Sequence, residues 1–230
     1  MSQNPLLLLS SMAAREVLRE LAAQYSRLSG QAVHAAAAGG VDVAKRVAGG
    51  EQVDVVVLSD TAIDKLIGAG QLLPDSRIDI ARSGVAVAVR AGTTAPDVSG
   101  EQAVKQAVLN AATLSYSTGP SGIYLEKLFE RWGILAAVRD RIVVPPPGTP
   151  VASLVADGRA ELGFQQLSEL LNVPGIQVLG ALPAAIQCIT VFSGGVGANS
   201  DRPDDARALL AYMASPPAEE VKHRYGMEAA

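Results

Sequence analysis

Short apolar segments alternate with segments of helical spacing over the first 70 residues of this 230-residue chain. The apolar segments 6–9, 32–37 and 53–58 predict strands, and the segments 12–29, 41–47 and 60–67 that follow them predict helices. Gly30 and Gly68 stand where the first and third helices are expected to end, as helix-terminating glycines do. Strict alternation of strand and helix favours a parallel sheet with helices on its faces, so we expect an α/β protein.

The rest of the chain predicts strands and helices in a less regular order. Residues 84–90 form a strongly β-prone segment, and residues 91–100 form a loop rich in Gly, Pro and Thr. We expect further strands at 113–116, 142–144, 160–165 and 186–192, and helices at 101–111, 123–132, 151–157, 168–171, 203–215 and 218–224.

Loops of small residues follow three of the predicted strands and open the next helices. They are Ser10–Ser11, Gly39–Gly40 and residues 117–122, which include Ser117, Ser121 and Gly122. A helix N-terminus presents unpaired N–H groups and roughly half a positive charge, and serine or glycine there lets an anion come close. Any one of these loops taken alone is better read as an N-cap or a tight turn. Three of them at predicted strand ends indicate a site for a small anion, because open α/β sheets bind ligands there.

The composition limits the other chemistry that the chain can carry. It has one cysteine, Cys188, and two histidines far apart, His34 and His223, so it can form no intrachain disulfide and we expect no metal and no cofactor. The net charge of −4, without a long basic run, argues against nucleic acid as the main partner. No apolar run reaches the roughly 18 residues that a membrane span needs.

Four segments carry a resemblance to a known family: LLLSSMAAREVLRELAAQY, AAAAGGVDVAKRVAGGEQVDVVVLSDTAIDKLIGAGQL, YSTGPSGIYLEKLFERWGI and PVASLVADGRAELGFQQLSEL. In this order they make the chain resemble the periplasmic molybdate-binding proteins over essentially its whole length, including the branch that is similar to bacterial aconitate isomerase. The resemblance implies a type 2 periplasmic binding protein-like fold, with two α/β lobes, a ligand cleft between them and two hinge strands. The hinges would lie near residues 84–89 and 186–192, with residues 1–83 plus 189–230 in the first lobe and residues 84–188 in the second.

The resemblance also implies where the ligand is held. The family's first hydroxyl donor matches Ser10 or Ser11, and its second serine falls on Gly39–Gly40, so that hydroxyl is missing here. The third contact, a backbone group that opens a helix of the second lobe, matches Ser121, Gly122 and Ile123. The fourth opens the helix after Gly148 and matches Val151. The fifth is a tyrosine hydroxyl in the family, and Gln165 and Gln166 stand in its place.

The two departures from the family pattern bear on the identity of the anion. A fully ionised oxyanion has only acceptors, whereas glutamine brings both a donor and an acceptor. Loss of a serine side chain enlarges the pocket, and Arg82, at the first predicted hinge, offers a planar fork that suits a carboxylate. Arg82 is equally well read as a solvated surface residue. We therefore expect a di- or tricarboxylate in preference to a molybdate-like oxyanion.

Two functions from different classes follow. The first is a monomeric solute-binding protein that captures a small anion for an ABC-type transporter. The alternative is an isomerase that converts trans- to cis-aconitate by an allylic proton shift, for which the sequence assigns no catalytic residue. The apolar run at residues 6–9 has no Lys or Arg before it and no A-x-A site after it, so we expect a periplasmic protein if an export signal was removed and a cytoplasmic one otherwise.

Overall fold

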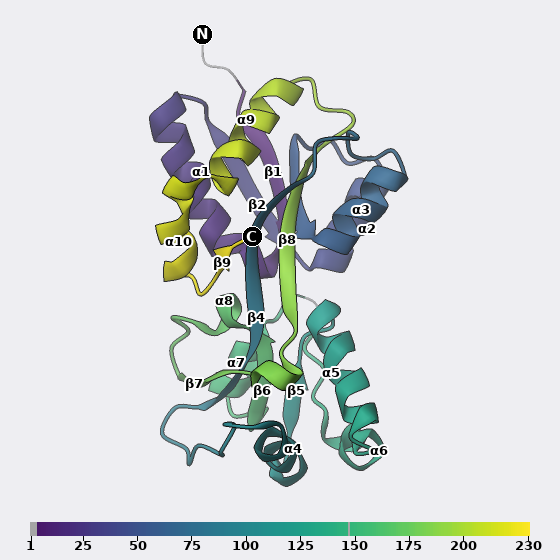
Figure 1. The fold of residues 1–230 in the computed structure, drawn as a ribbon, viewed down its shortest axis with the longest axis vertical. Coiled ribbons are helices and arrows are strands. Elements are labelled where there is room, and N and C mark those ends of the chain that lie inside the picture. The colour runs from purple at the N-terminus through teal and green to yellow at the C-terminus, as the bar shows by residue number, and fades with distance from the viewer. Residues whose placement is uncertain (1–3, 147) are drawn as a thin grey trace. The chain divides into compact units, whose positions relative to one another are not determined.

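The computed structural model describes residues 4–146 and 148–230, so Pro147 of the predicted loop at 145–150 lies outside the described residues. The chain separates into two compact units: unit 1 is Met1–Ser83 with Val191–Ala230, and unit 2 is Gly84–Thr190. The chain leaves unit 1 within strand β4 (Ile78–Arg90) and returns to it within strand β8 (Ile189–Val196), both labelled in Figure 1.

The sheet of unit 1 is built on three parallel strands, as the alternating pattern predicts. β1 (Leu6–Ser11) lies between β2 (Val33–Ala38) and β3 (Val55–Ser59), and both neighbours run parallel to it. β8 then pairs with β3 in the antiparallel direction. A short strand near the C-terminus, β9 (Glu228–Ala229), pairs with the first part of β4. Unit 1 is therefore a mixed sheet, completed by strands from the end of the chain.

Helices cover both faces of the unit 1 sheet (Figure 1). On one face lie α1 (Arg15–Ser29), α9 (Pro203–Ala214) and α10 (Glu219–Arg224), and on the other lie α2 (Gly40–Ala48) and α3 (Asp60–Gly68). Successive side chains of β1 point to opposite faces, so Leu8 packs in the core with α1, and Leu9 packs in the core with α2 and α3. Gly30 ends α1 in the left-handed conformation, with φ of 75°.

Unit 2 has its own sheet and its own core. The second part of β4 pairs antiparallel with β6 (Leu162–Gln166) and β7 (Ile176–Ala181), and β5 (Leu114–Tyr116) runs parallel to β6. Phe129 and Phe164 pack edge to face in its main core. The helices of this unit are α4 (Glu101–Asn110), α5 (Pro120–Arg131), α6 (Leu135–Val138), α7 (Val151–Ala156) and α8 (Leu167–Leu170).

Several predicted elements differ from the structure. Residues 142–144 form no strand: Ile142 makes only an isolated bridge to Leu114. The strand expected at 186–192 begins at Ile189, because Ala184–Ile186 form a 3-10 turn and the Gln187 side chain takes the place of a strand neighbour. Its Oε1 accepts from the amide of Val85 (2.8 Å), and its Nε2 donates to the carbonyl of Val85 (3.1 Å). β7 was not predicted, and α5 begins at Pro120, three residues before the expected start.

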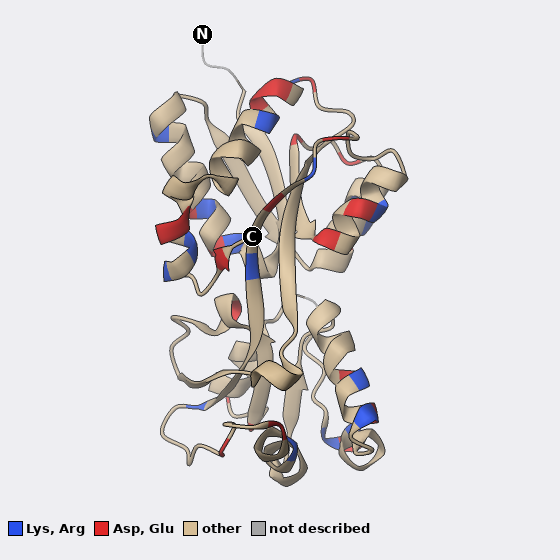
Figure 2. Cartoon of the chain, viewed as in Figure 1, with Lys and Arg blue, Asp and Glu red and all other residues tan. Residues whose placement is uncertain are grey.

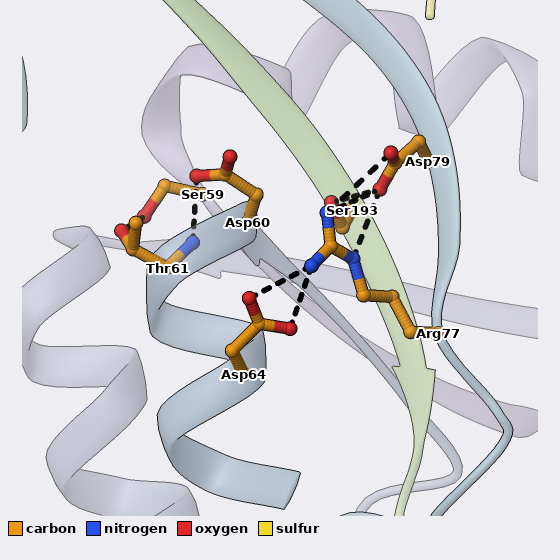
Figure 3. A network of polar contacts seen from close by, with 7 residues as sticks. All are labelled: Ser59, Asp60, Thr61, Asp64, Arg77, Asp79 and Ser193. Atoms are coloured by element: carbon orange, nitrogen blue, oxygen red, sulfur yellow. Dashed lines mark hydrogen bonds and ion pairs between the residues drawn. The ribbon is translucent and has the colours of Figure 1, made fainter.

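Charged residues lie on helices, in loops and on β4 and β9, whereas the other strands carry none (Figure 2). In unit 1 a network of exposed charged side chains surrounds Arg77, as Figure 3 shows. Arg77 Nη1 lies 2.7 Å from Asp64 Oδ1 of α3, and Arg77 Nε lies 3.1 Å from Asp79 Oδ1 of β4. Asp79 in turn accepts a 2.6 Å hydrogen bond from Ser193 Oγ of β8. The network thus fastens α3 to the two strands through which the chain leaves and re-enters unit 1.

Candidate anion-binding site

Four of the predicted residues come together at the carboxyl ends of β1 and β2 in unit 1. Parallel register pairs Ser10 with Ala37 and Ser11 with Ala38, so Gly39 and Gly40 follow directly at the same edge. A Cβ on Gly40 would lie 3.6 Å from Cβ of Ser11, which places Ser11 beside the start of α2. The sequence therefore identifies neighbours correctly here.

The two serines nevertheless face different sides of the sheet. Ser10 shares its face with Leu8 and points toward α1, and Ser11 shares its face with Leu9 and points toward α2. Ser10 Oγ donates a long 3.3 Å hydrogen bond to the carbonyl of Ser11. Ser11 Oγ is buried and has no hydrogen-bond partner among the described residues. Ser11 is thus the hydroxyl with free hydrogen-bonding capacity at this edge.

The start of α2 is less open to an anion than the sequence suggests. Gly39 is its N-cap and Gly40 its first residue, and both lack side chains that would cover the amides. Asp42 in the first turn directs its carboxylate back, so that Oδ2 would lie 3.1 Å from a Cβ on Gly39. A carboxylate of the chain already complements this helix N-terminus and weakens its attraction for a second anion.

A cavity of about 320 Å³ opens beside Ser10, and sequence reasoning missed its charged lining. Arg15, Glu16 and Arg19 of α1 line one side, and the small residues of β2 line the other. Arg15 Nε lies 2.8 Å from Glu16 Oε1, and Arg19 Nη2 lies 2.8 Å from Glu16 Oε2. The available signal was the four-residue spacing of two arginines in the first turns of the helix that follows Ser10.

In unit 2 the parallel strands β5 and β6 again bring predicted residues to one edge. Tyr116 pairs with Phe164, so Ser117 and Gln165 follow at neighbouring strand ends. Ser117 Oγ lies 2.9 Å from Ser121 Oγ, and a Cβ on Gly122 would lie 1.6 Å from the carbonyl oxygen of Ser117. Only glycine fits this turn without moving the backbone.

The amides expected to hold the anion at this turn are largely occupied. The amides of Gly122 and Ile123 both donate to the carbonyl of Gly119, at 3.0 and 3.1 Å. Both N–H groups have a partner within the helix because the helix begins earlier than predicted, and the ligand contact through Gly122 and Ile123 stays a prediction. The amide and hydroxyl of Ser121 remain as the groups of this turn that can meet a ligand.

Gln165 has a different role from the one expected of it. Its Oε1 accepts a 3.1 Å hydrogen bond from the amide of Ala152, and its Nε2 donates to Glu169 Oε1 at 2.9 Å. Gln165 therefore caps the start of α7, where Val151 is the first residue, and both polar atoms of its amide bond the protein itself. The side chain of Val151 is apolar and buried, so the backbone amide is the donor that this residue can offer.

Gln166 keeps one half of its amide free. Its Nε2 donates a 2.7 Å hydrogen bond to Thr190 Oγ1, whereas its buried Oε1 accepts no hydrogen bond from the described residues. A buried acceptor without a donor is unfavourable, so this oxygen suits a ligand that carries an O–H group.

The remaining candidates lie outside these clusters. Arg82 is half exposed, and its Nε lies 3.3 Å from Glu228 Oε2 of β9. His34 and His223 are both exposed. Tyr124 donates from its hydroxyl to the carbonyl of Ile186 (3.0 Å), and burial raises the pKa of this phenol.

Two features are absent from the part of the chain that the structure describes. No three His, Cys, Asp or Glu residues group there in a way that could hold a metal ion. No helix among residues 4–146 and 148–230 is both long enough and apolar enough to cross a membrane.

The chain is similar to known proteins both in sequence and in fold. An aconitate isomerase of Pseudomonas sp. is 38% identical over 231 residues, covering 97% of this chain and 87% of that protein. The periplasmic molybdate-binding protein of Azotobacter vinelandii has a TM-score of 0.80 at 22% identity, with 96% of this chain and 98% of that one covered. The sulfate-binding protein SubI of Mycobacterium tuberculosis H37Rv has a TM-score of 0.80 at 15% identity, over 98% of this chain and 86% of that one.

These likenesses confirm the expected fold class, a mixed α/β fold of the periplasmic binding protein type. The family model for bacterial extracellular solute-binding proteins matches residues 6–228, which is nearly the whole chain. The chain therefore belongs to the family of bacterial extracellular solute-binding proteins.

Proposed function

We propose that this solute-binding protein takes a small organic anion with two or three carboxylates. The observation that carries the proposal is the cavity beside Ser10, which two arginines line. Its volume, about 320 Å³, lies in the range of sites for small organic ligands. Guanidinium forks bind carboxylates in a planar, bidentate manner, whereas an inorganic oxyanion can be held by uncharged donors alone.

The donors in unit 2 support the same ligand class. Ser121, the Val151 amide and Gln166 are uncharged, and Gln166 also offers an acceptor. A sulfate-like or molybdate-like anion without protons has no use for that acceptor, whereas a hydroxyl or protonated carboxyl group does. We propose Ser121, the Val151 amide and Gln166 as ligand contacts of unit 2, and Ser10 and Ser11 as ligand contacts of unit 1. We also propose that Arg82 binds a carboxylate group of the ligand.

A thermal-shift titration with tricarballylate, trans-aconitate, succinate and molybdate tests the ligand class. A ligand present at 100 times its Kd stabilises the folded protein by about 2.7 kcal/mol, which raises Tm by several degrees. We expect this rise with the tricarboxylates. A rise with molybdate and none with any carboxylate would overturn the proposal. Delivery of the ligand to an ABC-type transporter by a monomeric, periplasmic protein is the role we propose for this binding.

A second function, isomerisation of an unsaturated tricarboxylate, is favoured by the 38% identical aconitate isomerase. An allylic shift removes a proton from the CH₂ of trans-aconitate and returns one to the carbon at the far end of the former double bond, so it needs a base beside the substrate. Glu16 is the carboxylate that lines the cavity, and it is the base that we propose for this reaction.

Incubation with trans-aconitate in D₂O, followed by NMR, separates the two functions: cis-aconitate with deuterium at carbon shows an isomerase. Binding without exchange leaves a solute-binding protein.

A further inference from the structure

The two arginines of the cavity share one carboxylate of their own chain. Glu16 reaches Arg15 with one oxygen and Arg19 with the other, both at 2.8 Å. All three side chains line the cavity together with Ser10. Its two positive charges are therefore countered from within by a group with the same chemistry as the ligand class proposed above.

Glu16 also occupies donors that a ligand carboxylate would use. It takes the Nε donor of Arg15 and an Nη2 donor of Arg19, so one edge of each guanidinium fork is engaged. A bidentate contact needs two neighbouring donors of one fork. While Glu16 remains in place, a ligand thus meets forks that are partly engaged, and a negative charge beside them.

The bridge is of a kind that exchanges readily. The side chains of Arg15, Glu16 and Arg19 are 51%, 34% and 73% exposed. Exposed ion pairs contribute at most about 1 kcal/mol each, because water and salt screen them. Among the described residues, Glu16 is the only ion-pair partner that these two arginines have. Nothing else in the described structure therefore holds the two forks in place.

We propose that Glu16 is a built-in competitor for the ligand at Arg15 and Arg19. This inference rests on the proposed function. A carboxylate of the incoming polycarboxylate replaces that of Glu16 at the two guanidinium groups, while the rest of the ligand engages the uncharged donors beside Ser10. A ligand with a single carboxylate only substitutes one carboxylate for another, whereas a polycarboxylate adds contacts elsewhere. Glu16 thus makes the site select for ligands with several carboxylates.

Isothermal titration of tricarballylate into the wild-type protein and three variants tests the exchange. Glu16→Gln removes the competing charge, and we expect it to bind tricarballylate roughly three- to tenfold more tightly. Glu16→Asp keeps the charge on a side chain shorter by one CH₂, so we expect a weaker bridge to the two arginines and tighter binding of tricarballylate than by wild type. Arg19→Gln should bind roughly threefold or more weakly.

The matched control is Glu51→Gln, which breaks the exposed pair of Glu51 with Arg46 on α2 and removes the same net charge. It should bind tricarballylate like wild type. Equal binding by wild type, Glu16→Gln and Glu16→Asp would overturn the exchange while the ligand class stands. An increase in Glu16→Gln that Glu51→Gln shares would also overturn it, in favour of a general charge effect. Absence of binding by wild type and all variants would overturn the proposed ligand class itself.

Discussion

The Nε2 of Gln166, at the end of β6, donates a 2.7 Å hydrogen bond to Oγ1 of Thr190, the last residue of unit 2 before the chain returns to unit 1. Both side chains are buried. This bond holds the glutamine amide in one orientation and leaves its carbonyl oxygen as the free acceptor. The only uncharged acceptor proposed for the ligand is thus positioned by a threonine 24 residues further along the chain.

Thr190→Val keeps the shape and volume of the side chain, and we expect it to destabilise the protein. The substitution leaves the buried Gln166 N–H without an acceptor, which costs about 1–3 kcal/mol of unfolding free energy. Urea denaturation measures the difference. Thr190→Ser, which keeps the hydroxyl, is the control. Equal stability of the valine and serine variants would show that the bond contributes nothing.

Ser11→Ala should weaken anion binding without weakening the fold. Ser11 Oγ bonds no described residue, so its removal breaks no contact within the protein and removes a buried, unsatisfied polar atom. If the hydroxyl binds the ligand, the loss of a hydrogen bond to a charged group reduces affinity by about 1.5–3 kcal/mol. Calorimetric titration and thermal denaturation of the same variant report the two effects separately. Unchanged affinity would remove Ser11 from the site.

Gly122→Ala should be strongly destabilising although it adds a single methyl group. The new Cβ would lie 1.6 Å from the carbonyl oxygen of Ser117, so the turn before α5 must move. We expect a loss of at least about 1–3 kcal/mol, as for an overpacked core. Gly68→Ala is the matched control, because a Cβ there meets nothing within 4 Å. If the two variants unfold at the same urea concentration, the turn is not as tight as described.

Lys222→Met should stabilise unit 1 and flatten its alkaline pH profile. Lys222 is fully buried, its Nζ has no hydrogen-bond partner among the described residues, and burial lowers the pKa of this amine from 10.5, with Glu219 opposing the shift. The unfolded chain therefore holds the proton to higher pH than the folded one. Stability of the wild type should rise with pH between the lowered pKa and 10.5.

Unfolding free energies of wild type and Lys222→Met, measured from pH 7 to pH 10.5, test this prediction. The methionine variant should start higher and lack the rise that the lysine produces. Lys127→Met, at an exposed position of α5, serves as the control and should follow the wild-type profile. Parallel profiles for wild type and Lys222→Met would show that the amine reaches water.

The alternation of strands and helices was readable because β1 and β3 are apolar runs, and because small residues follow β1 and β2. Elements that depend on packing partners far away in the sequence could not be predicted in this way. In β8, Gly194 and Gly195 look like a strand end, but a Cβ at Gly194 would lie 2.2 Å from Leu210 of α9. These glycines continue the strand because the helix packs directly on the backbone, which local sequence does not reveal.

The candidate site was likewise predictable only where local sequence determines it. Neighbouring strand ends could be predicted, since parallel register places Ser11 beside Gly40. The sequence could not predict which polar atoms remain without a hydrogen-bond partner inside the protein. The amides of Gly122 and Ile123 and the side chain of Gln165 are occupied by partners within the protein, which only the three-dimensional arrangement reveals. The four-residue spacing of Arg15 and Arg19 was the one available signal, and it was overlooked because such spacing is also common on exposed helix faces.

Unit 1 is made of two chain segments, and this bears on the order in which the protein is assembled during synthesis. The core around α1 includes Leu209, Leu210 and Met213 of α9 and Val221 of α10, and β3 acquires its second neighbour only from β8. All residues of unit 2 leave the ribosome before these. Because domains fold as units during translation, unit 2 is expected to fold first. The opening strands of unit 1 must then wait, with one core face uncovered, for the last forty residues of the chain.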